Sequence, residues 1–176
     1  MAAAVGLVIA AAGYGGREGG SVTIYLKQRL GAKGPPGQVA PVLMPVQRER
    51  RRRLSPAFRV LDALGRGPTA GERARGFLST WHVGTKWLGA SVHEHTATVN
   101  LTGAEPDFYA SAAIVYSLTA LRGVHAVRLR LEGKACCIYN MRGQPIRLLT
   151  RHTFRGWQGE PCPLRTYRDA VRCRGR

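Results

Sequence analysis

The sequence is poor in acidic residues. Only 10 Asp and Glu oppose 27 Lys and Arg, which leaves a net charge of +17 and a pI of about 11.1. Such a balance favours contact with a polyanion, and nucleic acid, an anionic lipid surface and a wall polymer all fit it equally well. The heavy use of Arg, Ala and Gly is also explained by codon bias, so charge alone does not define a function.

Long apolar runs are also missing. The longest one covers residues 1–16 and falls short of the roughly 20 residues that span a membrane. Its small residues Ala10, Ala11 and Ala12 are typical of the end of a signal peptide, although a positively charged leader is absent. We therefore expect residues 1–20 to be a signal-like apolar segment with a flexible linker, and the protein to be exported; a disordered tail is the alternative. Tyr14 stands where a lipid-modified cysteine would be, so a lipid anchor is not indicated.

The four cysteines lack the C-x-x-C spacing of zinc and redox sites. In an exported protein an even number of cysteines predicts disulfides. Because successive residues of a strand face opposite sides, we expect one of Cys136 and Cys137 to bridge to Cys162 and the other to be free to reach Cys173. In a cytosolic protein all four would be ordinary buried or free thiols.

The stretch 86–132 carries the clearest periodicity. Apolar and polar residues alternate over 86–92 and again over 97–102, which predicts a β-hairpin. Apolar residues at helical spacing then fill 108–122, and Gly123 follows where the helix must end. The segment 124–132 returns to a period of two, with Val127, Leu129 and Leu131 on one face and charged residues on the other. The sequence therefore predicts strand, strand, helix and strand in this order.

The first half of the chain adds further elements. Residues 21–27 alternate as a strand, and residues 39–46 fit a short edge strand because prolines interrupt them. Ser55-Pro56 is a typical helix start, and Thr69 with Glu72 matches a capping box that opens a short second helix. We predict an α+β fold, a mixed β-sheet with two main helices packed on one face, in the order β-(β)-α-β-β-α-β.

The sequence does not indicate an enzyme. Its serines lack the Gly-x-Ser-x-Gly setting of a hydrolase nucleophile, and carboxylates are scarce. We therefore expect no catalytic residues and no cofactor.

A metal site at the hairpin turn is the strongest alternative. His93 and His95 would offer two ligands if they lay on one face of a strand, with a third from His82, His125 or His152. The spacing does not require this arrangement, and an exposed polar turn explains the same residues. No metal site is predicted.

The densest run of charge is a candidate polyanion patch. Arginines of this patch near an anionic surface each contribute roughly 1 kcal/mol; they are Arg48, Arg50, Arg51, Arg52 and Arg53. The alternative is a solvated connection into the next helix. Aromatic residues do not interleave with the arginines, which argues against nucleic acid as the partner.

Several short segments occur in a fixed order and spacing between Val22 and Glu132. They are Ser55-Pro56, Gly67–Glu72, Gly84-Thr85, Ala97–Leu101, Ile114–Thr119, Gly123-Val124 and Val127–Leu129. In this order the sequence resembles the GerMN domain, which is named for the sporulation and germination protein GerM and also occurs in envelope lipoproteins of the LpqB type.

The resemblance implies an α+β domain over 21–140, an extracytoplasmic setting, no catalytic residues and a role in interaction at the bacterial envelope. The partner would be an envelope protein, with an anionic polymer or membrane surface as the alternative. Two features depart from the family pattern. The hairpin turn, usually acidic and Gly-rich, is His93-Glu94-His95 here, and residues 141–176 form a basic, Cys-containing extension that we expect to pack on the domain.

Overall fold

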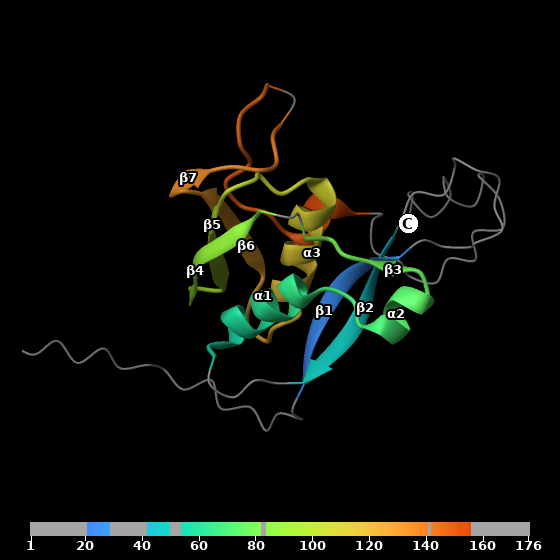
Figure 1. Ribbon diagram of the computed structural model, residues 1–176. Coiled ribbons are helices and arrows are strands. Elements are labelled where there is room, and N and C mark those ends of the chain that lie inside the picture. Colours follow the sequence, from blue (N-terminus) through green and yellow to red (C-terminus); the bar gives the residue numbers. More distant parts are fainter. Residues whose placement is uncertain (1–20, 29–41, 50–53, 82–83, 141, 156–176) are drawn as a thin grey trace, which may run out of the picture.

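The computed structural model describes residues 21–28, 42–49, 54–81, 84–140 and 142–155 (Figure 1). Within these ranges the chain forms, in order, β1 Ser21–Gln28, β2 Val42–Glu49, α1 Pro56–Arg66, α2 Ala70–Ala74, β3 Phe77–Leu78, β4 Lys86–His93, β5 Thr96–Thr102, α3 Phe108–Leu118, β6 Ala126–Leu131, β7 Lys134–Ala135 and the 3-10 turn η1 Arg151–Phe154. The predicted α+β class and order of the main elements are confirmed.

The strands divide between two sheets, where the sequence suggested one mixed sheet. The first sheet has the order β2-β1-β3 and is antiparallel. β1 runs beside β2 from Ser21 opposite Glu49 to Gln28 opposite Val42. β2 lies at the edge of this sheet, as the prolines of this segment indicated. Pro45 lies within β2, and an edge strand tolerates a proline, which has no backbone N–H to donate to a neighbouring strand.

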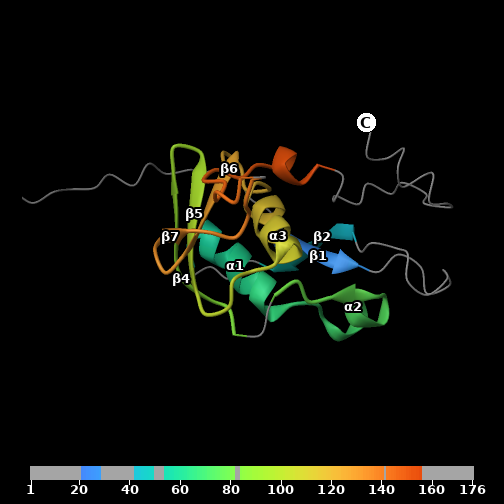
Figure 2. The same cartoon turned by 90° about the horizontal axis from the view of Figure 1, so that it is seen from above.

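The second sheet has the order β4-β5-β6-β7 and is the mixed one. β4 and β5 form the predicted hairpin, and β5 and β6 are parallel because α3 carries the chain across between them. Parallel neighbours need such a crossover connection. Figure 2 shows α1 and α3 on one side of this sheet and no described element on its other side.

α3 occupies the centre of the molecule. Every residue from Ala110 to Leu118 is buried, which fits a helix that is apolar almost all the way round. Asp107 caps its start by accepting a 2.7 Å hydrogen bond from the Ala110 N–H. The Ser117 hydroxyl accepts the Tyr25 N–H at 2.9 Å and donates to the Ala113 carbonyl at 2.5 Å. This buried hydroxyl therefore joins α3 to β1.

α1 begins where the sequence predicted. Ser55 accepts the Phe58 N–H and Pro56 is the first helical residue. The buried face of α1 differs slightly from the predicted stripe, because Phe58 is only half-buried; the buried residues are Ala57, Val60, Leu61, Ala63 and Leu64. α1 packs on β4 through Gly65, whose backbone lies against the indole ring of Trp87.

The segment after β7 packs on the domain as far as it is described. Leu149 forms an antiparallel bridge with Val127, and Phe154 is fully buried. The Tyr116 hydroxyl on α3 donates a 2.8 Å hydrogen bond to the Phe154 carbonyl. The remainder of the predicted extension, and the predicted signal-like segment 1–20, lie outside the described residues. No helix in the described ranges is long and apolar enough to cross a membrane.

Candidate functional site

The outer face of the second sheet is polar and uncovered by the described elements. Along β5, Ala97, Val99 and Leu101 are fully buried against the helices, so the alternate residues Thr98 and Asn100 point outward. We define the outer face as the polar outward residues of β4, β5 and β6, which are Lys86, Ser91, His93, Thr96, Thr98, Asn100, Thr102, Arg128 and Arg130.

Two arginines sit in register with polar neighbours on this outer face. Arg128 lies beside Thr98, and Arg130 lies beside Asn100. Within the described ranges neither guanidinium has an ion-pair partner. Asn100 uses its side-chain oxygen to accept the Gly133 N–H at 2.9 Å, which holds the amide in place. The outer face therefore presents Arg128 and Arg130 without an ion-pair partner in the described ranges, among hydroxyl and amide groups, with Lys86 opposite Thr102 at one end.

The free edge of the sheet is β4. Its pairing with β5 shifts register between Trp87 and Gly89, which marks a bulge at Leu88. Leu88 and Val92 are 58% and 45% exposed, respectively. Bulges twist an edge away from continuous strand pairing, so contact with another molecule is favoured at the outer face over the edge.

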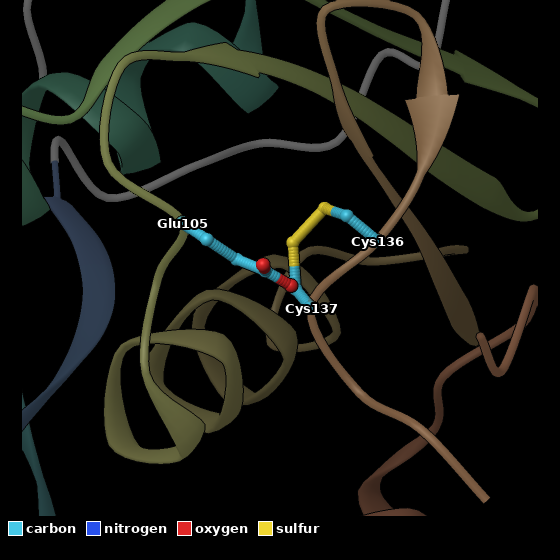
Figure 3. Close-up of side chains that lie close together, drawn as sticks. All are labelled: Glu105, Cys136 and Cys137. Carbon is cyan, nitrogen blue, oxygen red and sulfur yellow. A yellow bond between two sulfur atoms is a disulfide. The ribbon is translucent and has the colours of Figure 1, made fainter. Parts of the chain in front are cut away.

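A second cluster lies near the N-terminal end of α3, where Figure 3 shows Glu105 with Cys136 and Cys137. Glu105 lies in the loop before α3, and the two cysteines follow β7. One carboxylate oxygen of Glu105 and both cysteine sulfurs lie within 4.8 Å of one another. Both cysteines are buried, whereas Glu105 is exposed.

Tyr139 holds the carboxylate of this cluster. Its hydroxyl donates a 2.9 Å hydrogen bond to Oε1 of Glu105. This hydrogen bond to a carboxylate raises the pKa of Tyr139, because the neutral hydroxyl is the form that donates.

The structure pairs Cys136 directly with Cys137 in a disulfide. The expected bridges from this pair to Cys162 and Cys173 are therefore not the pairing in the structure, and those two residues lie outside the described ranges. The physical reason is the backbone at Cys137, whose φ of +87° breaks the strand-like alternation on which the expectation rested. Both sulfurs can then lie on the same side.

The predicted arginine patch is described only at Arg48, since Arg50, Arg51, Arg52 and Arg53 lie outside the described residues. Arg48 lies on β2 and forms a two-pronged ion pair with Glu72, with Nη1–Oε1 at 2.7 Å and Nη2–Oε2 at 2.5 Å. Glu72 also accepts the Thr69 N–H at 2.8 Å and so completes the predicted capping box. Arg48 therefore neutralises an internal carboxylate and is not free for an external anion.

The ion pair lowers the pKa of Glu72 to about 2, first through the hydrogen bond from Arg48 and then through the Thr69 N–H and the positive charge, against the opposing effect of burial. Glu72 is 6% exposed. Such a shift makes the corner between β2 and α2 a stabilising contact of the fold.

The hairpin turn does not align its histidines on a strand face. Glu94 and His95 have φ values of +44° and +64°, as in a tight two-residue turn. The side chain of His93 is widely exposed. Nδ1 of His95 lies 2.8 Å from the Gly123 carbonyl, and the centroid of its ring lies 5.1 Å from that of His125, with the two rings tilted. The turn's geometry is thus that of an exposed connection tied to the loop before β6.

The four serines considered as nucleophiles differ in their surroundings. Ser111 and Ser117 are fully buried in α3, and Ser79 bonds to the backbone of Trp81. Ser91 is exposed and lies on the outer face. Burial removes Ser111 and Ser117 from contact with a substrate, whereas Ser79 and Ser91 are at the surface.

The fold and its uncovered sheet face define a small α+β domain built of two sheets around a central helix. The sequence matches the family described as Germane, sporulation and spore germination, over residues 23–137. The chain therefore belongs to this sporulation and spore germination family, and the predicted GerMN resemblance is confirmed.

Solved structures show the same fold. Tandem GerMN domains of the sporulation protein GerM from Bacillus subtilis superpose with a TM-score of 0.60 at 16% identity, over 74% of this chain and 44% of that one. The first GerMN domain of the same protein gives 0.53 at 20% identity, over 75% of this chain and 98% of that one. This chain thus spans less than half of the tandem structure. Among curated proteins, none matches the sequence.

Proposed function

We propose that this chain is a non-catalytic interaction domain of the bacterial cell envelope that binds an acidic protein partner through its outer face. The observation that carries the proposal is the pair Arg128 and Arg130, which lack ion-pair partners in the described ranges and lie on the uncovered face. An arginine without an internal partner keeps its charge and its fork of donors for another molecule.

The neighbouring groups fit a protein surface. Ser91 lies beside Thr98 and then Arg128 across the three strands, so a row of donors crosses the sheet. Arginine is enriched at the centres of interfaces, where its fork matches carboxylates. A partner with carboxylates spaced along an exposed strand or helix would meet both arginines at once.

A binding role agrees better with these residues than catalysis does. The hydroxyl of the buried Ser117 is tied to the backbone, and the family described for this sequence concerns sporulation and spore germination. The outer face is a flat array of strand residues that would bind without needing to enclose a substrate.

The extracytoplasmic setting rests on two features. The predicted signal-like segment 1–20 precedes the domain, and the paired Cys136 and Cys137 fit an oxidising compartment. Cell fractionation of the full-length chain in its host should place it outside the cytoplasm. Recovery in the cytosol alone would contradict this part of the proposal.

An anionic wall polymer is the second candidate partner, favoured by the same two arginines and the net charge of +17. Salt separates the two candidates. Binding that releases counterions from a polyanion weakens steeply as salt rises, whereas a protein interface with a packed centre depends less on salt. An anionic membrane surface would behave as the polymer does in this assay and is distinguished by vesicle sedimentation.

The test compares two charge reversals. Arg128→Glu with Arg130→Glu reverses both arginines of the outer face, and Arg122→Glu with Arg142→Glu makes the same charge change at exposed arginines elsewhere. Binding to isolated envelope material should fall at least about ten-fold in the first variant only, as expected for lost charge-assisted pairs. If binding fell equally in both variants, the interaction would depend on net charge alone and not on the outer face. If binding fell in neither variant, the outer face would not be the binding surface.

A further inference from the structure

The cluster near the N-terminal end of α3 combines three potential metal ligands, Glu105, Cys136 and Cys137, from two segments that are far apart in the sequence. Glu105 precedes α3, whereas Cys136 and Cys137 follow β7, and their ligand atoms lie within 4.8 Å of one another (Figure 3). The fold thus brings a carboxylate close to the two sulfurs of a disulfide. The disulfide itself does not need a carboxylate for its stability.

The spacing is close to that of a tetrahedral site. Zinc binds thiolate sulfur at about 2.3 Å and carboxylate oxygen at about 2.0–2.2 Å, so neighbouring ligand atoms lie roughly 3.3–3.8 Å apart. Opening the disulfide moves the sulfurs apart toward this separation. The Glu105 oxygen must then approach the sulfurs by at most about 1.5 Å, which is within reach of an exposed side chain.

The carboxylate is held in place before a metal arrives. Tyr139 donates to Oε1 of Glu105 at 2.9 Å, and an outer hydrogen bond of this kind orients metal-ligating carboxylates. The backbone contributes as well, because Cys137 holds a φ of +87° that a non-glycine residue rarely adopts. Strained backbone of this kind tends to occur at functional sites.

We propose that Cys136, Cys137 and Glu105 form a redox-gated site for a thiophilic divalent cation such as Zn²⁺. In the disulfide state the sulfurs are bonded to each other and the site is closed. After reduction two thiolates and one carboxylate carry three negative charges toward the ion, and thiolates select Zn²⁺ over Mg²⁺ and Ca²⁺. The exposed side of Glu105 leaves the fourth position to water.

The gating step requires a dithiol reductant. One of its thiolates attacks a sulfur of the Cys136–Cys137 bond, which forms a mixed disulfide and releases the other cysteine as a thiolate. The second thiol of the reductant then closes its own disulfide and releases the second cysteine. Two electrons and two protons pass to the protein, and the cation displaces the thiol protons when it binds.

The test uses full-length protein carrying Cys162→Ser and Cys173→Ser, so that only the adjacent pair can supply thiolates. One sample is oxidised, and the other is reduced and freed of reductant under anaerobic conditions. Co²⁺ serves as the optical probe, and Zn²⁺ affinity is measured by competition with a chromophoric chelator. The reduced protein should bind one equivalent of Co²⁺ with a thiolate charge-transfer band and tetrahedral d–d bands, and the oxidised protein should show neither.

Two variants assign the ligands. Glu105→Gln should keep the charge-transfer band but weaken Zn²⁺ binding by about ten-fold or more, since even outer-shell changes cost 10–100-fold. Glu132→Gln, at another exposed carboxylate, should bind as the parent does. Absence of the charge-transfer band in the reduced parent would overturn the site. Parent-like Zn²⁺ affinity in Glu105→Gln would overturn the three-ligand assignment.

Discussion

The arginines on two strands of this protein differ in whether they have an ion-pair partner. Arg48 on β2 is almost buried and forms a two-pronged pair with Glu72, whereas Arg128 and Arg130 on β6 face outward with no ion-pair partner in the described ranges. The side chains are chemically identical. What differs is whether a neighbouring element brings a carboxylate within reach.

This difference shows why a net charge of +17 cannot be assigned to binding by counting. One arginine stabilises the corner between β2 and α2, and the other two are left for an external partner. We therefore expect substitution of Arg48 on β2 to change the free energy of unfolding, and substitution of Arg128 and Arg130 on β6 to change binding alone.

The largest effect should come from Arg48→Ala. It leaves the Glu72 carboxylate with little solvent and without its cation, which costs about 3 kcal/mol in comparable buried pairs. Denaturant unfolding should report this loss, with Arg130→Ala as the matched control at an exposed arginine. Equal stability of the two variants would erase the distinction between β2 and β6.

Acid should weaken the same corner. The folded pKa of Glu72 is about 2 and its unfolded value is near 4.5, so its stabilising contribution is complete above about pH 5 and is lost as the pH falls toward 2. The size of this contribution is about 3 kcal/mol. Unfolding measured across this range should show the decline in the parent protein.

Glu72→Gln provides the control for the acid effect. The variant should be less stable than the parent at neutral pH, and the gap should close toward pH 2, where the parent carboxylate also becomes protonated. A gap that stays constant with pH would contradict the assigned role of Glu72.

Gly65→Ala tests how closely α1 packs on the second sheet. A Cβ at this position would run into the indole ring of Trp87, so the helix and β4 must separate. Overpacking of this kind costs about 1–2 kcal/mol, measured as a lower thermal midpoint. Gly71→Ala on α2 is the matched control, because its Cβ meets no atom within 4 Å and alanine favours helix. An equal change of the thermal midpoint in the two variants would refute the close contact between Gly65 and Trp87.

The smallest effect on stability should come from Arg128→Ala with Arg130→Ala. Arg130 is exposed and Arg128 is half-buried, and surface side chains without internal partners change the free energy of unfolding by less than about 0.5 kcal/mol. Denaturant unfolding should therefore superimpose on the parent curve. A loss near that of Arg48→Ala would mean that the arginines of β6 support the fold.

The local elements could be predicted because their causes are local. Ser55-Pro56 starts α1, Thr69 and Glu72 form the capping box, and alternation over β6 separates its buried and outward residues. The outer face could likewise be inferred from that alternation at Arg128 and Arg130, although its lack of cover could not.

The long-range features could not be predicted because the sequence holds no local trace of them. Arg48 and Glu72 are 24 positions apart and meet only through the fold. The division into two sheets depends on β1 and β5 pairing with different neighbours. The positive φ at Cys137 has no sequence marker such as glycine, and it accompanies the pairing of the adjacent cysteines.

Site-specific photo-crosslinking in cells of the native host tests the central claim most directly. A photoreactive amino acid replaces Thr98 on the outer face or, in a second strain, the exposed Arg66 on α1. A partner held by the outer face should give a covalent adduct from position 98 and none from position 66, and Arg128→Glu with Arg130→Glu should abolish that adduct. An adduct from position 66 alone, or an adduct from position 98 that survives the charge reversal, would contradict the proposed binding surface.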